Sequence, residues 1–142
     1  AQIGPLIRTI LLLALIAAGP PASAEIWIIA TRANNIHCEV GDDPQKAGLM
    51  CNIFRRVGPP AQAKPEDCTA SWGHAYYISE RGPVQMLCFE KWSNDWPGNG
   101  KFKDAEAANF GGIACKATRN TLECSNLDGH GFFLSRKVQK VF

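Results

Sequence analysis

The sequence has almost no excess of charge of either sign. Its 142 residues include 15 Lys and Arg against 13 Asp and Glu, which gives a formal net charge of +2 at pH 7. Nucleic-acid binding requires a concentrated basic surface that faces the phosphates. The densest basic cluster, Arg136, Lys137 and Lys140, stands near the end of the sequence, and we interpret it as a solvated tail. We therefore expect no nucleic-acid partner.

The common catalytic signatures are also missing. The chain has no G-x-S-x-G elbow and no phosphate-binding loop. It has three histidines, His37, His74 and His130, and none of them stands at the H-x-x-x-H spacing of a metal site. We therefore expect a protein without catalytic residues, metal or cofactor. A small hydrolase-like enzyme that uses His130 or His74 is the alternative, with Asp128 or Glu80 as the acidic neighbour.

The first 24 residues are typical of a secretory signal peptide. A single cation, Arg8, precedes an apolar run from Ile10 to Gly19, and the segment ends in Ala22-Ser23-Ala24. A membrane-spanning helix needs roughly 20 apolar residues, about twice the length of this run. We expect residues 1–24 to be a signal peptide and residues 25–142 to form one periplasmic or secreted domain. The alternative is a retained anchor that holds the domain on the periplasmic side of a membrane.

The six cysteines all follow this leader, and an even number in an exported domain predicts three disulfides. Apolar residues alternate around Cys38 and again around Cys51. If these two runs pair antiparallel with Cys38 facing Cys51, every facing pair is apolar, and residues 41–48 become a polar loop. A slip of one residue would turn one strand to the wrong face. We predict a Cys38–Cys51 disulfide across this hairpin.

A second hairpin is predicted around a two-residue turn at Arg119-Asn120. Counting outward from the turn places Cys115 opposite Cys124 at a non-hydrogen-bonded position, where α-carbons lie roughly 4.5 Å apart. That separation falls within the disulfide range. Arg119 is a poor residue for a tight hairpin turn, whereas Asn120 tolerates positive φ.

Cys68 and Cys88 remain and pair by elimination. The residues between them are typical of two strands joined by a turn at Ser79-Glu80-Arg81-Gly82, which places Gly73 across from Cys88. The third disulfide would therefore tie a preceding loop to a strand.

The rest of the chain is strand-like, with apolar runs at 25–30 and 130–135 and Gly and Pro between runs. Only residues 103–110 have a helical composition, about two turns, which Gly111-Gly112 would end. The expected fold is mainly β: a small antiparallel sandwich or partly open barrel, built of hairpins and stapled by disulfides. The hairpins that contain Cys38–Cys51 and Cys115–Cys124 resemble each other, which suggests an internal repeat.

The order of short motifs resembles a family of small exported bacterial proteins of unknown function, DUF6636. The motifs are NIHCEV with a second cysteine, C-x(3)-WGHA, G-P-V-x-M-x-C, GGIAC and GHGFFLSR, and they cover residues 34–142. The resemblance implies a signal peptide, paired cysteines and a closing Gly-His-Gly strand, but no activity. The chain differs after its fourth cysteine, where members carry a G-D-T-like segment and a later Y-G.

Exposed aromatic residues suggest a contact surface. Trp92 and Trp96 lie in a Gly-, Asn- and Pro-rich stretch with Lys91, Lys101 and Lys103 nearby. Such residues anchor a partner protein or stack on a sugar. We expect a binding or interaction module whose 91–103 loop contacts a protein or cell-envelope component. The alternative is an accessory subunit of a membrane protein complex, held by the uncleaved N-terminal segment.

Overall fold

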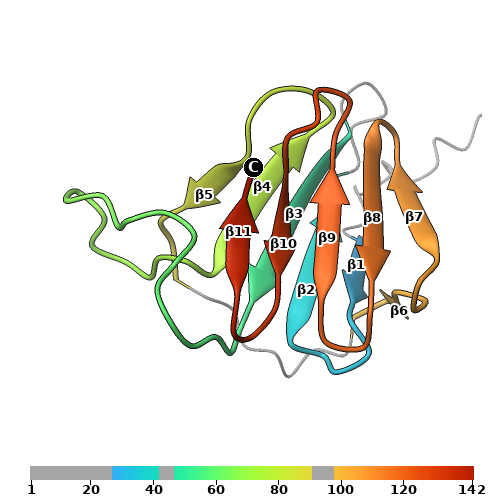
Figure 1. Cartoon of the computed structure of the whole chain (residues 1–142), viewed down its shortest axis with the longest axis horizontal. Coiled ribbons are helices and arrows are strands. Elements are labelled where there is room, and N and C mark those ends of the chain that lie inside the picture. Colours follow the sequence, from blue (N-terminus) through green and yellow to red (C-terminus); the bar gives the residue numbers. More distant parts are fainter. Residues whose placement is uncertain (1–26, 42–46, 91–97) are drawn as a thin grey trace, which may run out of the picture.

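The computed structural model describes residues 27–41, 47–90 and 98–142 (Figure 1). These residues form eleven β-strands in two sheets. The first sheet has the order β5 (Gln85–Leu87), β4 (Ala75–Ser79), β3 (Gly48–Ile53), β2 (Ile36–Val40), β1 (Trp27–Ala30), β6 (Gly100–Lys101). The second has the order β11 (Gln139–Val141), β10 (Gly131–Leu134), β9 (Leu122–Ser125), β8 (Ile113–Ala117), β7 (Ala107–Phe110). Within the described ranges there is no helix, and so none that could span a bilayer.

The two sheets pack face to face around one hydrophobic core (Figure 1). Both contribute fully buried side chains, among them Leu49 and Ile78 from the first sheet and Ile113 and Leu122 from the second. The sheets remain separate and do not close into a barrel. The expected mainly β fold is therefore confirmed, and it takes the form of a sandwich.

The two disulfide hairpins have the predicted registers. Cys38 faces Cys51 between β2 and β3, and Cys115 faces Cys124 between β8 and β9. Both pairs are disulfide-bonded, with α-carbons 4.0 Å and 4.1 Å apart. Such short separations belong to non-hydrogen-bonded positions of an antiparallel pair. Alternation of apolar residues predicted the first register, and the two-residue turn at Arg119-Asn120 predicted the second.

The third disulfide joins Cys68 to Cys88, as elimination predicted. The register predicted for the neighbouring strands β4 and β5 was wrong by one residue. Ala75 pairs with Leu87, which puts His74, and not Gly73, in line with Cys88. The reason lies in the β4–β5 connection. It bends at Gly82, whose φ is +87°, so the loop is longer than the two-residue turn assumed from the sequence.

Two further expectations were wrong. Residues 103–110 contain no helix, because Ala107–Phe110 forms β7 and pairs with β8 through the turn at Gly111. A two-turn helix is marginal in isolation, so strand pairing determines the structure here. Residues 136–140 are not a solvated tail. They belong to the β10–β11 hairpin, in which Gln139 is buried and Val141 packs on the core.

Each sheet contains the same antiparallel meander of five strands, β1–β5 in the first half and β7–β11 in the second. In both halves the disulfide joins the second and third strands, and an aromatic residue of the fourth strand faces the second cysteine. These residues are Tyr76 opposite Cys51 and Phe132 opposite Cys124. The two rings meet in the core with centroids 5.7 Å apart. The resemblance between the two hairpins thus extends to entire halves.

The sequence before the fourth strand repeats as well. GHAYYIS (73–79) leads into β4 and GHGFFLS (129–135) leads into β10. The glycine that opens each motif has positive φ, +85° at Gly73 and +79° at Gly129. Glycine adopts this conformation at little steric cost. The two halves run in opposite directions, so each end of the sandwich is built from loops of both.

Candidate functional site

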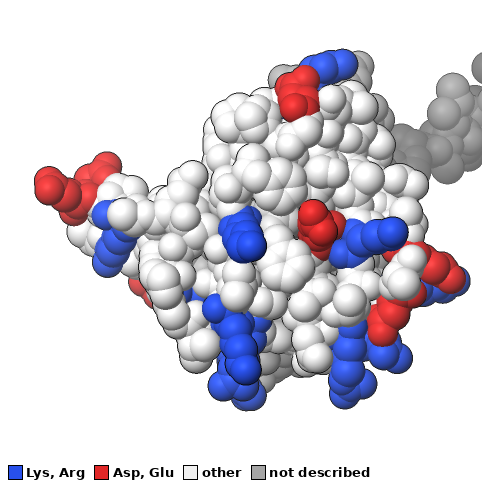
Figure 2. Space-filling model, in the orientation of Figure 1, with Lys and Arg blue, Asp and Glu red and all other residues white. Residues whose placement is uncertain are grey.

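Four connections converge at one end of the sandwich, at the bottom of Figure 1. They comprise residues 31–35 before β2, 54–58 after β3, 118–121 between β8 and β9, and 135–138 between β10 and β11. We call this end the basic end, because its exposed charged groups are mostly Arg and Lys. In Figure 2, Lys and Arg side chains project from this lower edge of the molecule.

Hydrogen bonds frame the basic end. Ala33 N donates to Arg119 O at 3.0 Å, and Val57 N donates to Arg136 O at 2.8 Å. Each of these bonds connects a loop of the first sheet to a turn of the second. The connections are therefore held against one another by backbone contacts and form one continuous surface.

The Asn35 side chain supplies a further tie. Its Nδ2 donates to Arg55 O, and its Oδ1 accepts from Arg55 N, both at 2.8 Å. This pair of bonds imitates one rung of a β-ladder. Phe54 N also donates to Asn35 O at 3.0 Å. The start of the β3–β4 connection is thereby fixed beside the β1–β2 loop, which orients Arg55.

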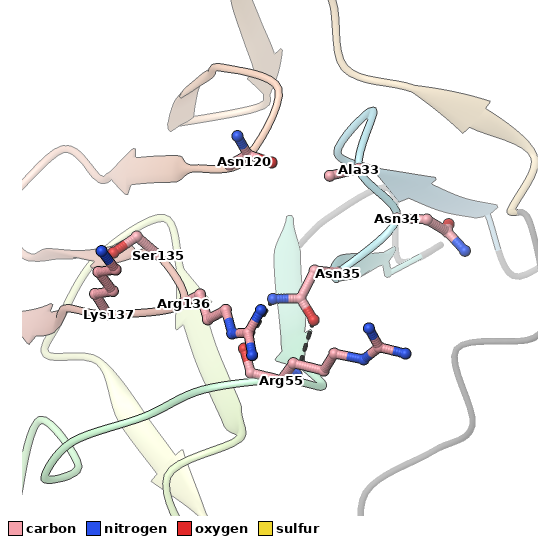
Figure 3. A pocket seen from close by; sticks show the side chains of 8 residues that line it. All are labelled: Ala33, Asn34, Asn35, Arg55, Asn120, Ser135, Arg136 and Lys137. Atoms are coloured by element: carbon pink, nitrogen blue, oxygen red, sulfur yellow. Dashed lines mark hydrogen bonds between the residues drawn. The ribbon is translucent and has the colours of Figure 1, made fainter.

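A pocket of about 640 Å³ opens between these connections (Figure 3). This volume lies in the range of small-molecule sites. The lining residues come from all four connections: Ala33, Asn34, Asn35, Arg55, Asn120, Ser135, Arg136 and Lys137. They combine three cations with amide and hydroxyl groups, and none of the eight is acidic. In Figure 3, Arg55 and Arg136 lie on one wall, with Asn35 between them, and Asn120 lies across the opening.

Only some of the described cations of the molecule are paired with an acid. Within the ranges the structure describes, the ion pairs are Arg32–Asp104, Arg81–Asp128 and Lys103–Glu106. Arg55, Arg136 and Lys137 take part in none of them. Three positive charges that line one pocket without an acid among the lining residues raise the local potential, and an anion would lower it.

Asn34 connects the pocket to the inside of the first sheet. Its φ is +62°, and its Oδ1 lies 2.7 Å from His37 Nε2 and 2.9 Å from Lys101 Nζ. Burial lowers the pKa of His37 below its ordinary value of 6.5, and the positive charge of Lys101 lowers it further. Neutral His37 therefore supports the wall of the pocket from behind.

At the opposite end of the sandwich, the acidic residue Asp128 connects two loops. The β4–β5 loop carries Glu80 and Arg81 where the β10–β11 turn of the other half carries Arg136 and Lys137. Arg81 pairs with Asp128 at 2.8 Å, and Gly82 N donates to the same carboxylate at 2.8 Å. The hydrogen bond from Gly82, followed by the contact with Arg81, holds the pKa of Asp128 below its usual range.

The residues predicted for the contact surface do not all lie at the pocket. Lys91, Trp92 and Trp96 lie outside the described residues. Lys101 reaches the edge of the pocket through its hydrogen bond to Asn34. Lys103 instead approaches Glu106 to 3.9 Å. The basic cluster that was interpreted as a tail contributes two pocket residues, Arg136 and Lys137.

Sequence reasoning assigned no role in a site to the other six lining residues, which are Ala33, Asn34, Asn35, Arg55, Asn120 and Ser135. They are scattered along the chain, and no local pattern marks them. Only the repeated G-H-x-x-x-x-S motif held a signal. Aligning its two copies sets Glu80 against Arg136, so the two halves carry opposite charges at this position.

The His74 ring and the acidic residues considered for catalysis lie in structural contacts. His74 Nδ1 lies 2.7 Å from Ile53 O, and Glu80 Oε1 accepts from Ala47 N. The carboxylate of Asp128 is bonded to Arg81 and Gly82, as described above. No group of three or more His, Cys, Asp or Glu suited to a metal ion occurs among the described residues.

Comparison with protein families relates the chain to a family. A family model described as "Family of unknown function (DUF6636)" matches residues 7–142, so the resemblance carried by the cysteine and Gly-His motifs is confirmed. No curated protein and no solved structure matches the chain.

Proposed function

We propose that this chain, which belongs to the DUF6636 family of unknown function, is an exported, non-catalytic module that binds an anionic ligand in the pocket of the basic end. Export is supported by the disulfides. All six cysteines are paired, and stable disulfides persist in oxidising compartments outside the cytosol. The proposed signal peptide, residues 1–24, lies outside the described residues.

The observation that supports anion binding is the set of three cations in the pocket lining, Arg55, Arg136 and Lys137, which form no ion pair within the described ranges. Guanidinium groups bind carboxylate, phosphate and sulfate through paired N–H donors. The hydrogen bonds of Asn35 and Val57 hold the backbone of Arg55 and Arg136 in place before any ligand arrives. A preorganised site loses less conformational entropy on binding.

The chemical character of the lining favours binding over catalysis. Guanidinium and ammonium groups remain protonated near neutral pH, and amide and hydroxyl groups donate and accept hydrogen bonds without titrating. These groups orient an anion but do not exchange protons with it. The polar side chains Asn120 and Ser135 suit hydroxyl or carbonyl oxygens of a larger ligand.

Titration with small anions tests this proposal. Inorganic phosphate, sulfate and citrate are added to the oxidised protein, and binding is followed by backbone amide chemical shifts in NMR. We expect shifts concentrated at residues 33–35, 118–121 and 135–138. Arg55→Gln and Arg136→Gln should each weaken binding about tenfold, the effect of losing one charge-assisted contact.

Lys140→Gln is the matched control, because it removes one positive charge from an exposed position on β11 and leaves the pocket lining intact. If all three variants weaken binding equally, the interaction is with overall charge, and the pocket is not the site. Absence of shifts at the pocket with every anion would also reject the proposal.

The 91–103 loop remains a proposed part of the contact surface. Lys101, its described end, bonds to Asn34 in the pocket wall, so a ligand that extends from the pocket would meet this loop. Trp92→Ala/Trp96→Ala should then weaken capture of a cell-envelope component without altering small-anion binding. Equal capture by the wild type and the variant would exclude the loop.

A further inference from the structure

Two exposed apolar side chains lie beside the cations of the basic end. Val57 is 50% exposed and Val138 is 42% exposed. Val57 follows β3 and donates its backbone N–H to Arg136 O, while Val138 closes the β10–β11 turn through bonds between its backbone and Ser135. They come from different sheets but flank the same pair of cations, Arg136 and Lys137.

Single apolar side chains are often exposed on protein surfaces, so the exposure of one valine would need no explanation. Their placement here is more specific. Both belong to the connections that line the pocket, and both adjoin cations without ion pairs in the described ranges. Arg119, whose carbonyl accepts from Ala33, adds a fourth such cation to this end.

Cations that surround exposed apolar side chains complement the interface of an anionic membrane. Phosphate groups of the lipid lie at the level of the cations, while short apolar side chains reach the boundary of the acyl chains. Each Lys or Arg near such a surface strengthens binding about fivefold. A soluble polyanion would engage the same cations but would leave both valines in water.

We propose that the basic end docks on a membrane surface that contains anionic phospholipids, with Arg55, Arg119, Arg136 and Lys137 facing lipid phosphates and Val57 and Val138 entering the interface. This inference rests on the proposed anion site, because a lipid phosphate occupies that pocket. The bonds Val57–Arg136, Ala33–Arg119 and Asn35–Arg55 hold the connections that carry these cations and valines together at one end of the sandwich. Docking therefore requires little ordering of loops.

Vesicle sedimentation tests the inference with the oxidised protein. One set of vesicles contains phosphatidylglycerol and phosphatidylcholine, and the other contains phosphatidylcholine alone. We expect binding at least tenfold tighter to the anionic vesicles, and weaker as salt increases. Val57→Ser/Val138→Ser should reduce vesicle binding about tenfold, because apolar burial is lost, and should leave small-anion binding unchanged.

Leu127→Ser is the matched control. Leu127 is 58% exposed but follows β9, at the opposite end of the sandwich. Its substitution should leave vesicle binding at the wild-type level, whereas Arg55→Gln/Arg136→Gln should lose both vesicle and small-anion binding.

Four outcomes would overturn the inference. Binding of small anions without binding of anionic vesicles rejects membrane docking and keeps the proposed anion site. Equal vesicle binding by the valine variant and the wild type rejects entry of the valines into the membrane interface. Tighter binding to soluble polyphosphate or nucleic acid makes the partner a soluble polyanion. Absence of both small-anion and vesicle binding rejects the inference together with the proposed function.

Discussion

Gly131 begins β10 at a position where a side chain has no room. A β-carbon built there would collide with the carbonyl oxygen of Cys124 and approach the Phe142 ring to 2.8 Å. In the first half, the equivalent residue is Ala75, which is buried without such a collision. The two halves therefore differ in how closely the third and fourth strands approach at this point.

Gly131→Ala should lower the free energy of unfolding by about 3 kcal/mol, because the strand must shift to accommodate the methyl group. Gly129→Ala is the control: a β-carbon there meets nothing within 4 Å, and only the positive φ opposes it. That variant should lose about 1 kcal/mol. Urea unfolding of the oxidised variants measures both values, and similar losses would contradict the steric account.

His37 makes stability depend on pH. Its ring is buried and packs edge-on against Phe54, with centroids 4.7 Å apart. Burial, followed by the charge of Lys101, holds its pKa below 6.5 in the folded protein. The unfolded chain therefore binds a proton more readily than the folded one. The contribution of neutral His37 to the free energy of unfolding is fully present when the pH is above the ordinary pKa of histidine. It is lost as the pH falls below that value.

Urea unfolding at about pH 7.5 and about pH 5.5 tests this dependence. The wild type should lose more stability between these two pH values than His37→Gln, whose side chain does not titrate. His74 and His130 remain in both proteins, so the difference isolates His37. Equal losses would show that His37 contributes no pH dependence.

At the scale of elements, the loop contacts at the two ends of the sandwich explain why one end is closed. Asn126, at the start of the β9–β10 loop, donates from Nδ2 to Ser79 O and Gly82 O and accepts at Oδ1 from Asp128 N and His130 N. One amide thus holds the β4–β5 loop against the β9–β10 loop. Asn35 ties only two neighbouring connections, which leaves space for the pocket.

Removing this amide should weaken the closed end. Asn126→Ala should lower the free energy of unfolding by about 2 kcal/mol, because several partly buried hydrogen bonds are lost. Asn120→Ala is the control, because the Asn120 side chain makes none of the hydrogen bonds described above between the connections of the basic end. Urea unfolding and amide hydrogen exchange of residues 79–82 measure the effect. Unchanged exchange in Asn126→Ala would contradict the role of this amide.

Some elements follow from local sequence and others do not. Alternating apolar residues predicted the Cys38–Cys51 hairpin with its register, because a shift of one residue would expose an apolar face. The position of the turn at Arg119-Asn120 predicted the register of the Cys115–Cys124 hairpin. The same reasoning failed at β4–β5, where Gly82 lengthens the loop, and at β7, where pairing with β8 overrode helical composition. Loop conformation and strand pairing depend on contacts beyond the segment itself.

At the scale of the whole molecule, three disulfides join residues separated by 13, 20 and 9 positions. Each is worth roughly 3 kcal/mol by restricting the unfolded chain, and their sum is comparable to the total stability of a typical domain. Two of them lie within the single core that both sheets share.

Reduction should therefore unfold the protein. Circular dichroism in strong reductant should show loss of β-structure, and the melting transition should shift to a much lower temperature or disappear. The oxidised protein in the same buffer without reductant is the control. An unchanged melting curve after complete reduction, verified by thiol titration, would contradict this role of the disulfides.

The distribution of charge also emerges only at this scale. The net charge of +2 argued against a basic surface, yet Arg55, Arg119 and Arg136 meet at one end. They are far apart in the sequence and belong to connections of both sheets. A net charge sums over the chain and does not record where folding brings like charges together.

By itself, the sequence determined the mainly β class, the three disulfide pairs and the family, because these depend on short-range alternation, cysteine spacing and motif order. Only the tertiary structure decided that Arg136 and Lys137 line a pocket with Arg55. The two halves stack in opposite directions, so each end combines turns of one half with loops of the other. At one end, Asp128 pairs with Arg81 of the opposing loop. At the other end, cations from connections of both sheets line a pocket.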